Sequence, residues 1–236
     1  MTKHIVLTGA TSGIGRALAI QAHQLGYKLS LCGRSQAKMD QTLAMLSELE
    51  LNMENVLSDC FCVSDSQSIQ AFSAKAKQAN GDIDILINCA GLNNVRTLGY
   101  QTEIEALDWM MKINCYAPIE LIKSVLPDML AAKQGCIVNV LSTVCLFANA
   151  GISSYTASKM ALDGYTKVMR KEHRADNIKF LSVYPGGVDT EFRAAERPQY
   201  LTADAVAKAI LNQIDTDANT HIHELVIRPP AEENFC

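Results

Sequence analysis

The sequence predicts an α/β fold, a doubly wound parallel sheet of about seven strands with helices on both faces. Short runs rich in Ile, Val and Leu recur without alternating polar residues, as in strands that are buried on both faces. Longer segments with helical periodicity separate these runs, and this alternation is typical of parallel strands joined by right-handed crossovers. A glycine-rich segment directly follows the first run, at a place where such folds bind ligands.

The expected strands are the apolar runs at 4–9, 28–33, 54–63, 84–91, 135–142, 179–187 and 223–229. The expected helices lie between them, near 13–26, 35–50, 66–79, 102–132, 153–174 and 202–214. No internal repeat, low-complexity tract or break in composition divides the chain, so a single domain over residues 1–236 is the simplest organisation.

Composition excludes several classes of protein. Hydrophobic residues make up 48% of the 236 residues, which is enough for a sizeable core and argues against disorder. A formal net charge of −4 gives no reason to expect a nucleic-acid partner or a membrane-surface partner. No signal peptide or transmembrane helix is expected, because the chain reaches Gly9 early and no apolar run approaches about 18 residues.

The eight cysteines are expected to be reduced thiols in a cytoplasmic protein. Most lie inside apolar runs, no CxxC pair occurs, and no pair at zinc spacing follows Cys60 and Cys62. His221 and His223 alternate on the last expected strand, far from every motif. They are interpreted as structural, and no metal site is predicted.

The segment TGATSGIG, residues 8–15, joins the first expected strand to the first expected helix. Gly9, Gly13 and Gly15 let the chain turn tightly and let backbone N–H groups approach a pyrophosphate, whose charge the helix N-terminus favours. Glycines are common in turns, but their position at the first strand–helix junction favours a dinucleotide site.

The segment SSYTASKMALDGYTK, residues 153–167, places Tyr155 and Lys159 four residues apart on one face of an expected helix. An ammonium beside a phenol favours the phenolate and lowers the pKa of the phenol from about 10. Tyr155 is therefore a candidate proton donor and acceptor near neutral pH. Without other motifs, such a pair is more often a surface feature.

Other motifs do accompany it, namely NCAG at 88–91, Ser142 and PGGVDT at 185–190. With TGxxxGxG at 8–15 and YTASK at 155–159, they give a chain that resembles the single-domain branch of the short-chain dehydrogenase/reductase family. The resemblance covers residues 8–190 in the family's order and spacing. It implies a Rossmann-type sheet, a nicotinamide cofactor, and interconversion of a carbonyl and a secondary alcohol by hydride transfer.

The resemblance also implies where the cofactor binds. NAD-dependent members usually end the second strand with an acidic residue, whereas this chain has Gly33 followed by Arg34, whose guanidinium suits a 2′-phosphate. NADP(H) is therefore favoured over NAD(H). Cys62 replaces an aspartate that often contacts the adenine. The implied cofactor-binding residues are Gly9, Thr11, Ser12, Gly13, Ile14, Gly15, Arg34, Cys62, Val63, Asn88, Ala90, Gly91, Tyr155, Lys159, Pro185, Gly186, Val188 and Thr190.

Four residues form the catalytic set that the resemblance implies. Tyr155 is the general acid in reduction and the base in oxidation, and Lys159 lowers its pKa and binds the nicotinamide ribose. Ser142 polarises and orients the substrate carbonyl, and Asn114 holds a water that links Lys159 to solvent. Hydroxyl groups aimed at the carbonyl oxygen stabilise the alkoxide charge that hydride transfer builds there.

The implied substrate is a small carbonyl or alcohol compound bounded by Ser142, Val144, Phe147, Ile152, Tyr155, Gly187 and Phe192. Arg96 lies near this set as a solvated loop charge or, alternatively, as a contact for an anionic substrate. Residues 191–201 are expected to form a short, open lid. The family commonly pairs the helices at 102–132 and 153–174 between subunits, so a homodimer or homotetramer is expected.

Two other functions stay open at this point. One is a regulatory protein that binds NADP(H) without turnover, since a fold does not fix a function. The other is an epimerase or dehydratase of the sugar-nucleotide type, which also uses a YxxxK motif. Such enzymes usually carry a larger C-terminal substrate domain, and only 46 residues follow Thr190 here.

Overall fold

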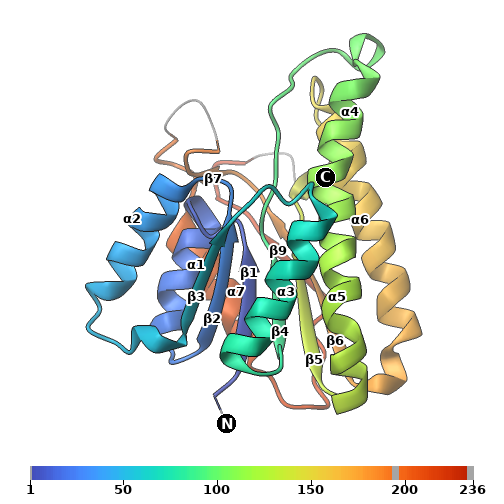
Figure 1. Cartoon of the computed structure of the whole chain (residues 1–236). Coiled ribbons are helices and arrows are strands. Elements are labelled where there is room, and N and C mark those ends of the chain that lie inside the picture. Colours follow the sequence, from blue (N-terminus) through green and yellow to red (C-terminus); the bar gives the residue numbers. More distant parts are fainter. Residues whose placement is uncertain (1, 193–196, 233–236) are drawn as a thin grey trace.

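The computed structural model describes residues 2–192 and 197–232 (Figure 1). In these ranges, seven parallel strands form one sheet in the order β3-β2-β1-β4-β5-β6-β9. The expected fold class is thereby confirmed. The strands of this sheet are β1 His4–Thr8, β2 Lys28–Gly33, β3 Val56–Cys60, β4 Ile85–Asn88, β5 Gly135–Val140, β6 Ile178–Pro185 and β9 Glu224–Ile227.

The inner strands lack a polar face because each of them contributes to two cores. In β1, Ile5 and Leu7 pack into the core on one face of the sheet, whereas Val6 packs into the core on the other face. Leu86 of β4 likewise faces away from its neighbours Ile85 and Ile87. Successive side chains of a strand point to opposite faces, so both faces require apolar residues.

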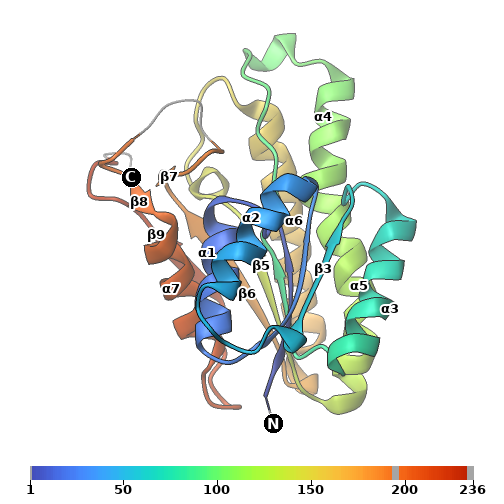
Figure 2. The ribbon, with the colours of Figure 1, turned by 60° about the vertical axis from the view of Figure 1, so that its left-hand side comes forward.

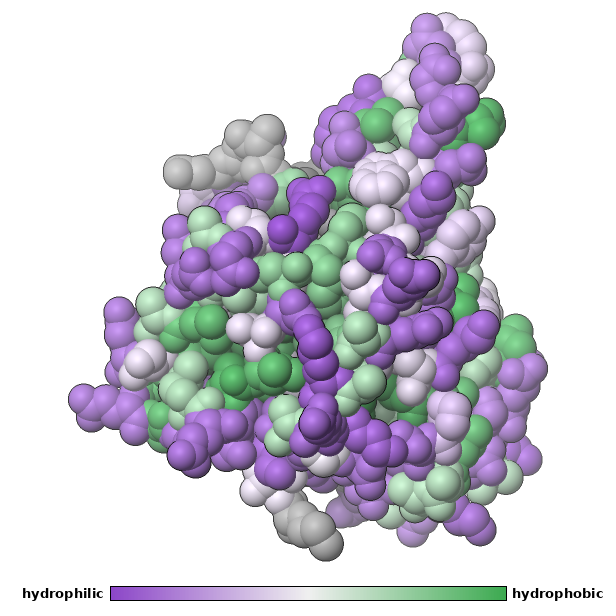
Figure 3. All heavy atoms as spheres, viewed as in Figure 1, coloured by the Kyte–Doolittle hydropathy of each residue, from purple (hydrophilic) through white to green (hydrophobic). Residues whose placement is uncertain are grey.

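Helices cover both faces of the sheet (Figures 1 and 2). One layer contains α1 Gly13–Gln24, α2 Gln36–Ser47 and α7 Ala203–Ile214. The other contains α3 Ser66–Asn80, α5 Ala117–Ala132 and α6 Ser153–Glu172. In Figure 3, hydrophobic residues are visible in the middle of the viewed face among hydrophilic ones. No helix in the described ranges has both the length and the apolar character needed to cross a membrane.

The expected helix over 102–132 is divided in the structure. Helix α4, Ile104–Met111, projects beyond the carboxyl ends of the strands (Figure 1) and is followed by a π-helical turn, Lys112–Tyr116, and then by α5. A small parallel pair, β7 Val188–Asp189 with β8 Leu201–Thr202, was not expected. Both features depend on contacts with distant segments, which local periodicity does not report.

Candidate active site

One cavity of about 660 Å³ opens at the carboxyl ends of the strands. Its wall combines residues as far apart in the chain as Gly9 and Phe192. Most residues predicted from the sequence lie in this wall: Gly9, Thr11, Ser12, Gly13, Ile14, Gly15, Arg34, Cys62, Val63, Ala90, Gly91, Ser142, Val144, Ile152, Tyr155, Lys159, Pro185, Gly186, Val188, Thr190 and Phe192.

The glycine loop between β1 and α1 is built by close backbone contacts. Gly9 has a φ of +72°, and a Cβ atom there would lie 2.9 Å from the backbone of Ala90. A Cβ atom at Gly15 would overlap the carbonyl oxygen of Gly9. Only glycine avoids both conflicts, so the loop packs against itself and against the segment that follows β4.

Helix α1 presents an open N-terminus at this loop. The side chain of its N-cap residue, Ser12, accepts no capping hydrogen bond, and no acidic residue occupies the first turn. The first backbone N–H groups of a helix lack partners within the helix, and the helix dipole places positive charge there. The loop and helix terminus therefore fit the pyrophosphate of a nicotinamide dinucleotide.

The end of β2 lies directly against the same loop. A Cβ atom at Gly33 would overlap the side chain of Thr11, so an aspartate or glutamate at this position would have to displace Thr11. The next residue, Arg34, is exposed and lines the cavity. This part of the wall therefore offers the Arg34 guanidinium, whereas an acidic side chain at residue 33 would overlap Thr11.

Ser142 begins the short 3-10 turn Thr143–Cys145 that follows β5. Its Oγ accepts a hydrogen bond from the backbone N–H of Val144 at 3.3 Å. The serine is thus a local cap as well as a residue of the cavity wall. Because its oxygen is the acceptor in this bond, its hydroxyl proton is available to a ligand oxygen.

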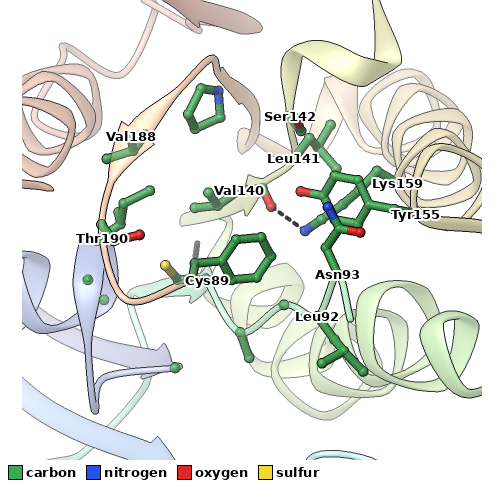
Figure 4. Close-up of a pocket in the computed structure, with 18 of the residues that line it drawn as sticks. Cys89, Leu92, Asn93, Val140, Leu141, Ser142, Tyr155, Lys159, Val188 and Thr190 are labelled. Atoms are coloured by element: carbon green, nitrogen blue, oxygen red, sulfur yellow. Dashed lines mark hydrogen bonds between the residues drawn. The ribbon is translucent and has the colours of Figure 1, made fainter. Parts of the chain in front are cut away.

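Tyr155 and Lys159 lie on α6, and their side chains come together on one side of the cavity with Ser142 (Figure 4). Lys159 is 4% exposed, and its Nζ donates a hydrogen bond to the carbonyl oxygen of Val140 at 2.8 Å. Burial lowers the pKa of Lys159. Tyr155 is 8% exposed and packs beside Ile152, so the phenol ring is held in a mainly apolar wall.

Asn114 lies in the π-helical turn and is fully buried behind the cavity wall. Its side-chain oxygen accepts the backbone N–H of Leu92 at 2.7 Å, and its Nδ2 donates to the Leu92 carbonyl at 2.8 Å. Nδ2 also lies 3.0 Å from the Oγ of Ser158 on α6. The amide thus fixes the segment after β4 against the helix that carries Tyr155 and Lys159.

Besides Asn114, three other predicted residues lie elsewhere than in the cavity wall. The side chain of Asn88 is buried and donates a hydrogen bond to Asn139 at 2.8 Å, beneath the wall. The ring of Phe147 lies under the guanidinium of Arg228, 4.8 Å from its carbon, and does not line the cavity. Gly187 is buried, and its backbone N–H donates to Glu232.

The sequence analysis missed the C-terminal contribution to the site. Ala231 and Glu232 line the cavity, and the Glu232 carboxylate accepts the Gly187 N–H at 2.6 Å and pairs with Arg228 at 3.1 Å. A Cβ atom at Gly186 would overlap this carboxylate. The adjacent glycines permit this close approach, but no sequence pattern identified the distant segment involved.

Cys62 and Cys89 both line the cavity. Cys62 donates to or accepts from Ser64, with 3.1 Å between Sγ and Oγ. Burial raises the pKa of the Cys89 thiol to about 12, so this thiol is protonated near neutral pH. The wall residues that were not assigned from the sequence are Phe61, Cys89, Leu92, Ile113, Val140, Leu141, Thr143, Asn149, Ala150, Tyr200, Ala231 and Glu232.

The expected lid at 191–201 is described only in part, because residues 193–196 lie outside the described ranges. On either side of that gap, Phe192 and Tyr200 line the cavity. The Phe192 ring is 6.3 Å from the Tyr155 ring, measured between centroids, and is half exposed. The described part of the segment therefore reaches the side of the cavity that holds Tyr155.

The family model described as short chain dehydrogenase matches residues 3–201. An uncharacterized oxidoreductase of Staphylococcus aureus strain MW2 is 29% identical over 231 residues, which cover 96% of this chain and 97% of that protein. Dehydrogenase/reductase SDR family member 7B of Mus musculus is 35% identical over 189 residues, which cover 79% of this chain and 58% of that protein.

Solved structures show the same fold. An alcohol dehydrogenase from Thermococcus sibiricus, complexed with 5-hydroxy-NADP, superposes with a TM-score of 0.89 at 24% identity and covers 98% of both chains. A metagenomic short-chain oxidoreductase in complex with NADP gives a TM-score of 0.85 at 27% identity, covering 96% of this chain and 97% of that one.

Proposed function

We propose that this chain, which belongs to the short-chain dehydrogenase family and is an NAD(P)-dependent oxidoreductase, uses NADP(H) to interconvert a carbonyl and a secondary alcohol. One observation carries the proposal: the glycine loop and the three residues Ser142, Tyr155 and Lys159 line one continuous cavity. A dinucleotide bound at the loop and a small carbonyl compound beside Tyr155 therefore share one site.

When bound, the nicotinamide supplies the hydride. Hydride transfer to a carbonyl carbon builds negative charge on the carbonyl oxygen. The hydroxyl of Ser142, whose oxygen already accepts the Val144 N–H, donates to that oxygen and orients it. The hydroxyl of Tyr155 donates to the same oxygen and transfers its proton there, which completes reduction; oxidation reverses this path.

Lys159 supports this proton transfer from the same helix. Its ammonium is held by the Val140 carbonyl, and a Cβ atom at Gly91 would lie 3.4 Å from its Nζ. A buried positive charge near the phenol favours the phenolate that remains after proton transfer. Lys159 would also bind the nicotinamide ribose, and Asn114 would keep the segment after β4 fixed through Leu92.

The preference for NADP(H) rests on the end of β2. Arg34 offers a planar guanidinium to a 2′-phosphate, and Gly33 leaves space only for the Thr11 side chain. An acidic residue that would bind the 2′-hydroxyl of NAD(H) is thus replaced by a cation beside the loop.

The remaining assignments follow from the same site. A single domain would carry both the cofactor and the substrate, since residues from Gly9 to Glu232 line one cavity. The exposed apolar side chains of Trp109, Tyr116, Met160 and Val168 on the α4–α6 side would pair subunits into a homodimer or homotetramer. A cytoplasmic location is supported by seven described cysteines that are all free thiols.

The test is NADPH oxidation, followed by absorbance with a panel of aldehydes and ketones, for the wild type and Tyr155→Phe. We expect turnover with at least one carbonyl class and none above background in the variant, while NADPH fluorescence reports unchanged binding. Tyr165→Phe, on the same helix but outside the cavity wall, is the matched control and should keep its activity. Full activity of Tyr155→Phe would refute the mechanism, and NADPH binding without any turnover would favour a regulatory protein.

A further inference from the structure

Among the polar groups of the cavity that the proposed chemistry leaves unused are the guanidinium of Arg96 and the side-chain oxygen of Asn93. Both belong to the segment that connects β4 to α4. Asn93 follows Leu92, whose backbone N–H and carbonyl are both bonded to Asn114. These unused groups therefore stand on a segment whose backbone is fixed beside the catalytic residues.

The backbone next to Arg96 is also fixed. The N–H of Thr97 donates to the Gly151 carbonyl at 3.1 Å, and Thr97 forms a β-bridge with Ile152. Ile152 immediately precedes α6, and Val95 packs against the apolar cluster that contains Ile152 and Tyr155. Arg96 is thus held at the substrate side of the cavity, between two residues that are tied to the start of the catalytic helix.

The charged groups in the cavity wall differ in their partners, and Arg96 is exposed to solvent. Among the described residues, the charged groups in the wall are Arg34, Arg96, Lys159 and Glu232. Glu232 is neutralised by Arg228, which pairs with it at 3.1 Å. Arg34 would bind the cofactor phosphate at the β2 end, and Lys159 is bonded to Val140. Arg96 forms no hydrogen bond or ion pair with the described part of the chain, which leaves a free cation on the substrate side.

Asn93 adds a second, independent requirement. Its Oδ1 is buried and has no hydrogen-bond partner in the structure. Asn93 lines the same cavity as Tyr155 and Ser142, and Figure 4 draws it on the side of the cavity that holds Tyr155 and Lys159. A buried polar atom without a partner is costly, and a ligand with a hydroxyl or amine group next to its carbonyl would supply the missing donor.

From these two groups we infer a substrate class: short carbonyl compounds that carry an oxyanion, a carboxylate or a phosphate, close to the carbonyl. Arg96 binds the oxyanion as a guanidinium fork, and Asn93 accepts a hydrogen bond from a donor next to the reacting carbon. This inference rests on the proposed reductase function. It sets the chemistry of the substrate, which the catalytic set leaves open.

The experiment measures kcat/KM for NADPH-dependent reduction of matched pairs. The first pair is 4-oxobutanoate and its methyl ester, and the second is glyceraldehyde 3-phosphate and glyceraldehyde. We expect the wild type to prefer the charged member of at least one pair by about tenfold or more, since a charge-assisted hydrogen bond contributes on the order of a tenfold effect or more. The pair with the larger ratio distinguishes a carboxylate from a phosphate.

Arg96→Gln should remove that preference mainly by raising KM for the charged compound, with the neutral compound changed less than about twofold. Arg96→Lys should restore part of it, because a single charge remains without the fork. Arg174→Gln, which removes another exposed arginine far along the chain, is the matched control and should keep the preference. Equal use of both members by the wild type, reduction of only the neutral members, or a preference that survives in Arg96→Gln would overturn the inference.

Asn93 is tested with 2-hydroxy-3-oxopropanoate and 3-oxopropanoate, which differ only by the hydroxyl next to the aldehyde. Asn93→Leu should reduce kcat/KM for the hydroxylated compound several-fold more than for the other. An equal loss for both would remove Asn93 from the inference. Failure of the reductase function itself gives a different pattern, because neutral and charged carbonyls would then both go unreduced, or Tyr155→Phe would remain active.

Discussion

The two ends of the cavity are built in different ways. At the glycine loop, backbone meets backbone: Gly9 touches Ala90, and Gly15 touches Gly9. At the substrate end, side chains from separate segments meet instead. The carboxylate of Glu232, from the C-terminal segment, accepts the N–H of Gly187 in the turn after β6. The guanidinium of Arg228 covers the ring of Phe147, which lies in the loop after β5. A backbone contact tolerates one residue type, whereas a side-chain contact can be made by several.

The difference predicts how each end responds to substitution. At the loop, a single methyl group should abolish function, because the backbone has no alternative position. At the substrate end, a single change should cause a partial loss, because neighbouring contacts remain. This is also why one fold can keep its cofactor site while its substrates diverge.

Gly15→Ala should have the largest effect. The added Cβ would overlap the Gly9 carbonyl, so the loop must open and the cofactor site is lost. We expect NADPH affinity to fall by at least about a hundredfold, or folding to fail, as measured by NADPH fluorescence and circular dichroism. Gly99→Ala is the matched control, since its Cβ would lie 3.8 Å from Ser153, an ordinary contact. Normal NADPH binding by Gly15→Ala would show that the loop is less constrained than its contacts indicate.

Arg34→Asp should have the second-largest effect on cofactor binding. The substitution replaces a guanidinium with a carboxylate that repels a 2′-phosphate, so NADPH affinity should fall by about tenfold to a hundredfold while NADH affinity holds or rises. Titration of both cofactors against the wild type measures the ratio. Arg174→Asp carries the same change of charge elsewhere on the surface and should leave the ratio unchanged. An unaltered NADPH to NADH ratio in Arg34→Asp would contradict the proposed cofactor preference.

The two ends of the cavity also differ in how far the sequence predicts them. The seven-stranded sheet and the glycine loop were predictable, since apolar periodicity and obligatory glycines are local signals. The substrate end was not, because no local pattern links Glu232 to Gly187 across 45 positions or places Phe147 beneath Arg228. The π-helical turn around Asn114 was not predicted for the same reason, since it depends on the contact with Leu92.

Glu232→Ala should cause a smaller, graded loss at the substrate end. It leaves the buried Gly187 N–H without its acceptor and Arg228 without its carboxylate partner. We expect kcat/KM for a carbonyl substrate to fall by about tenfold, with the unfolding temperature only slightly lowered. Glu232→Gln should recover part of the loss, because an amide oxygen still accepts the Gly187 N–H. Complete inactivation by either change would show that this end is as intolerant as the glycine loop.

Lys159 lies where the two ends meet, and the smallest of these effects is the one that its burial has on stability. The folded state lowers the pKa of Lys159 from the ordinary value of 10.5, so near neutral pH the unfolded chain binds this proton more readily than the folded chain. The contribution of Lys159 to stability therefore improves as the pH rises from the lowered pKa towards 10.5, and no further gain is expected above that value.

Lys159→Met keeps the length of the side chain and removes the buried charge, so it should be inactive yet more stable than the wild type near pH 7. Urea unfolding of both proteins between pH 6 and pH 10 measures the difference, which should shrink as the pH rises. Lys167→Met is the matched control on the same helix, because its ammonium is half exposed and pairs with Asp163 at 2.7 Å. A stability difference between the two proteins that stayed constant with pH would mean that the contacts of the buried ammonium offset its desolvation. The catalytic lysine would then not lower the stability of the fold.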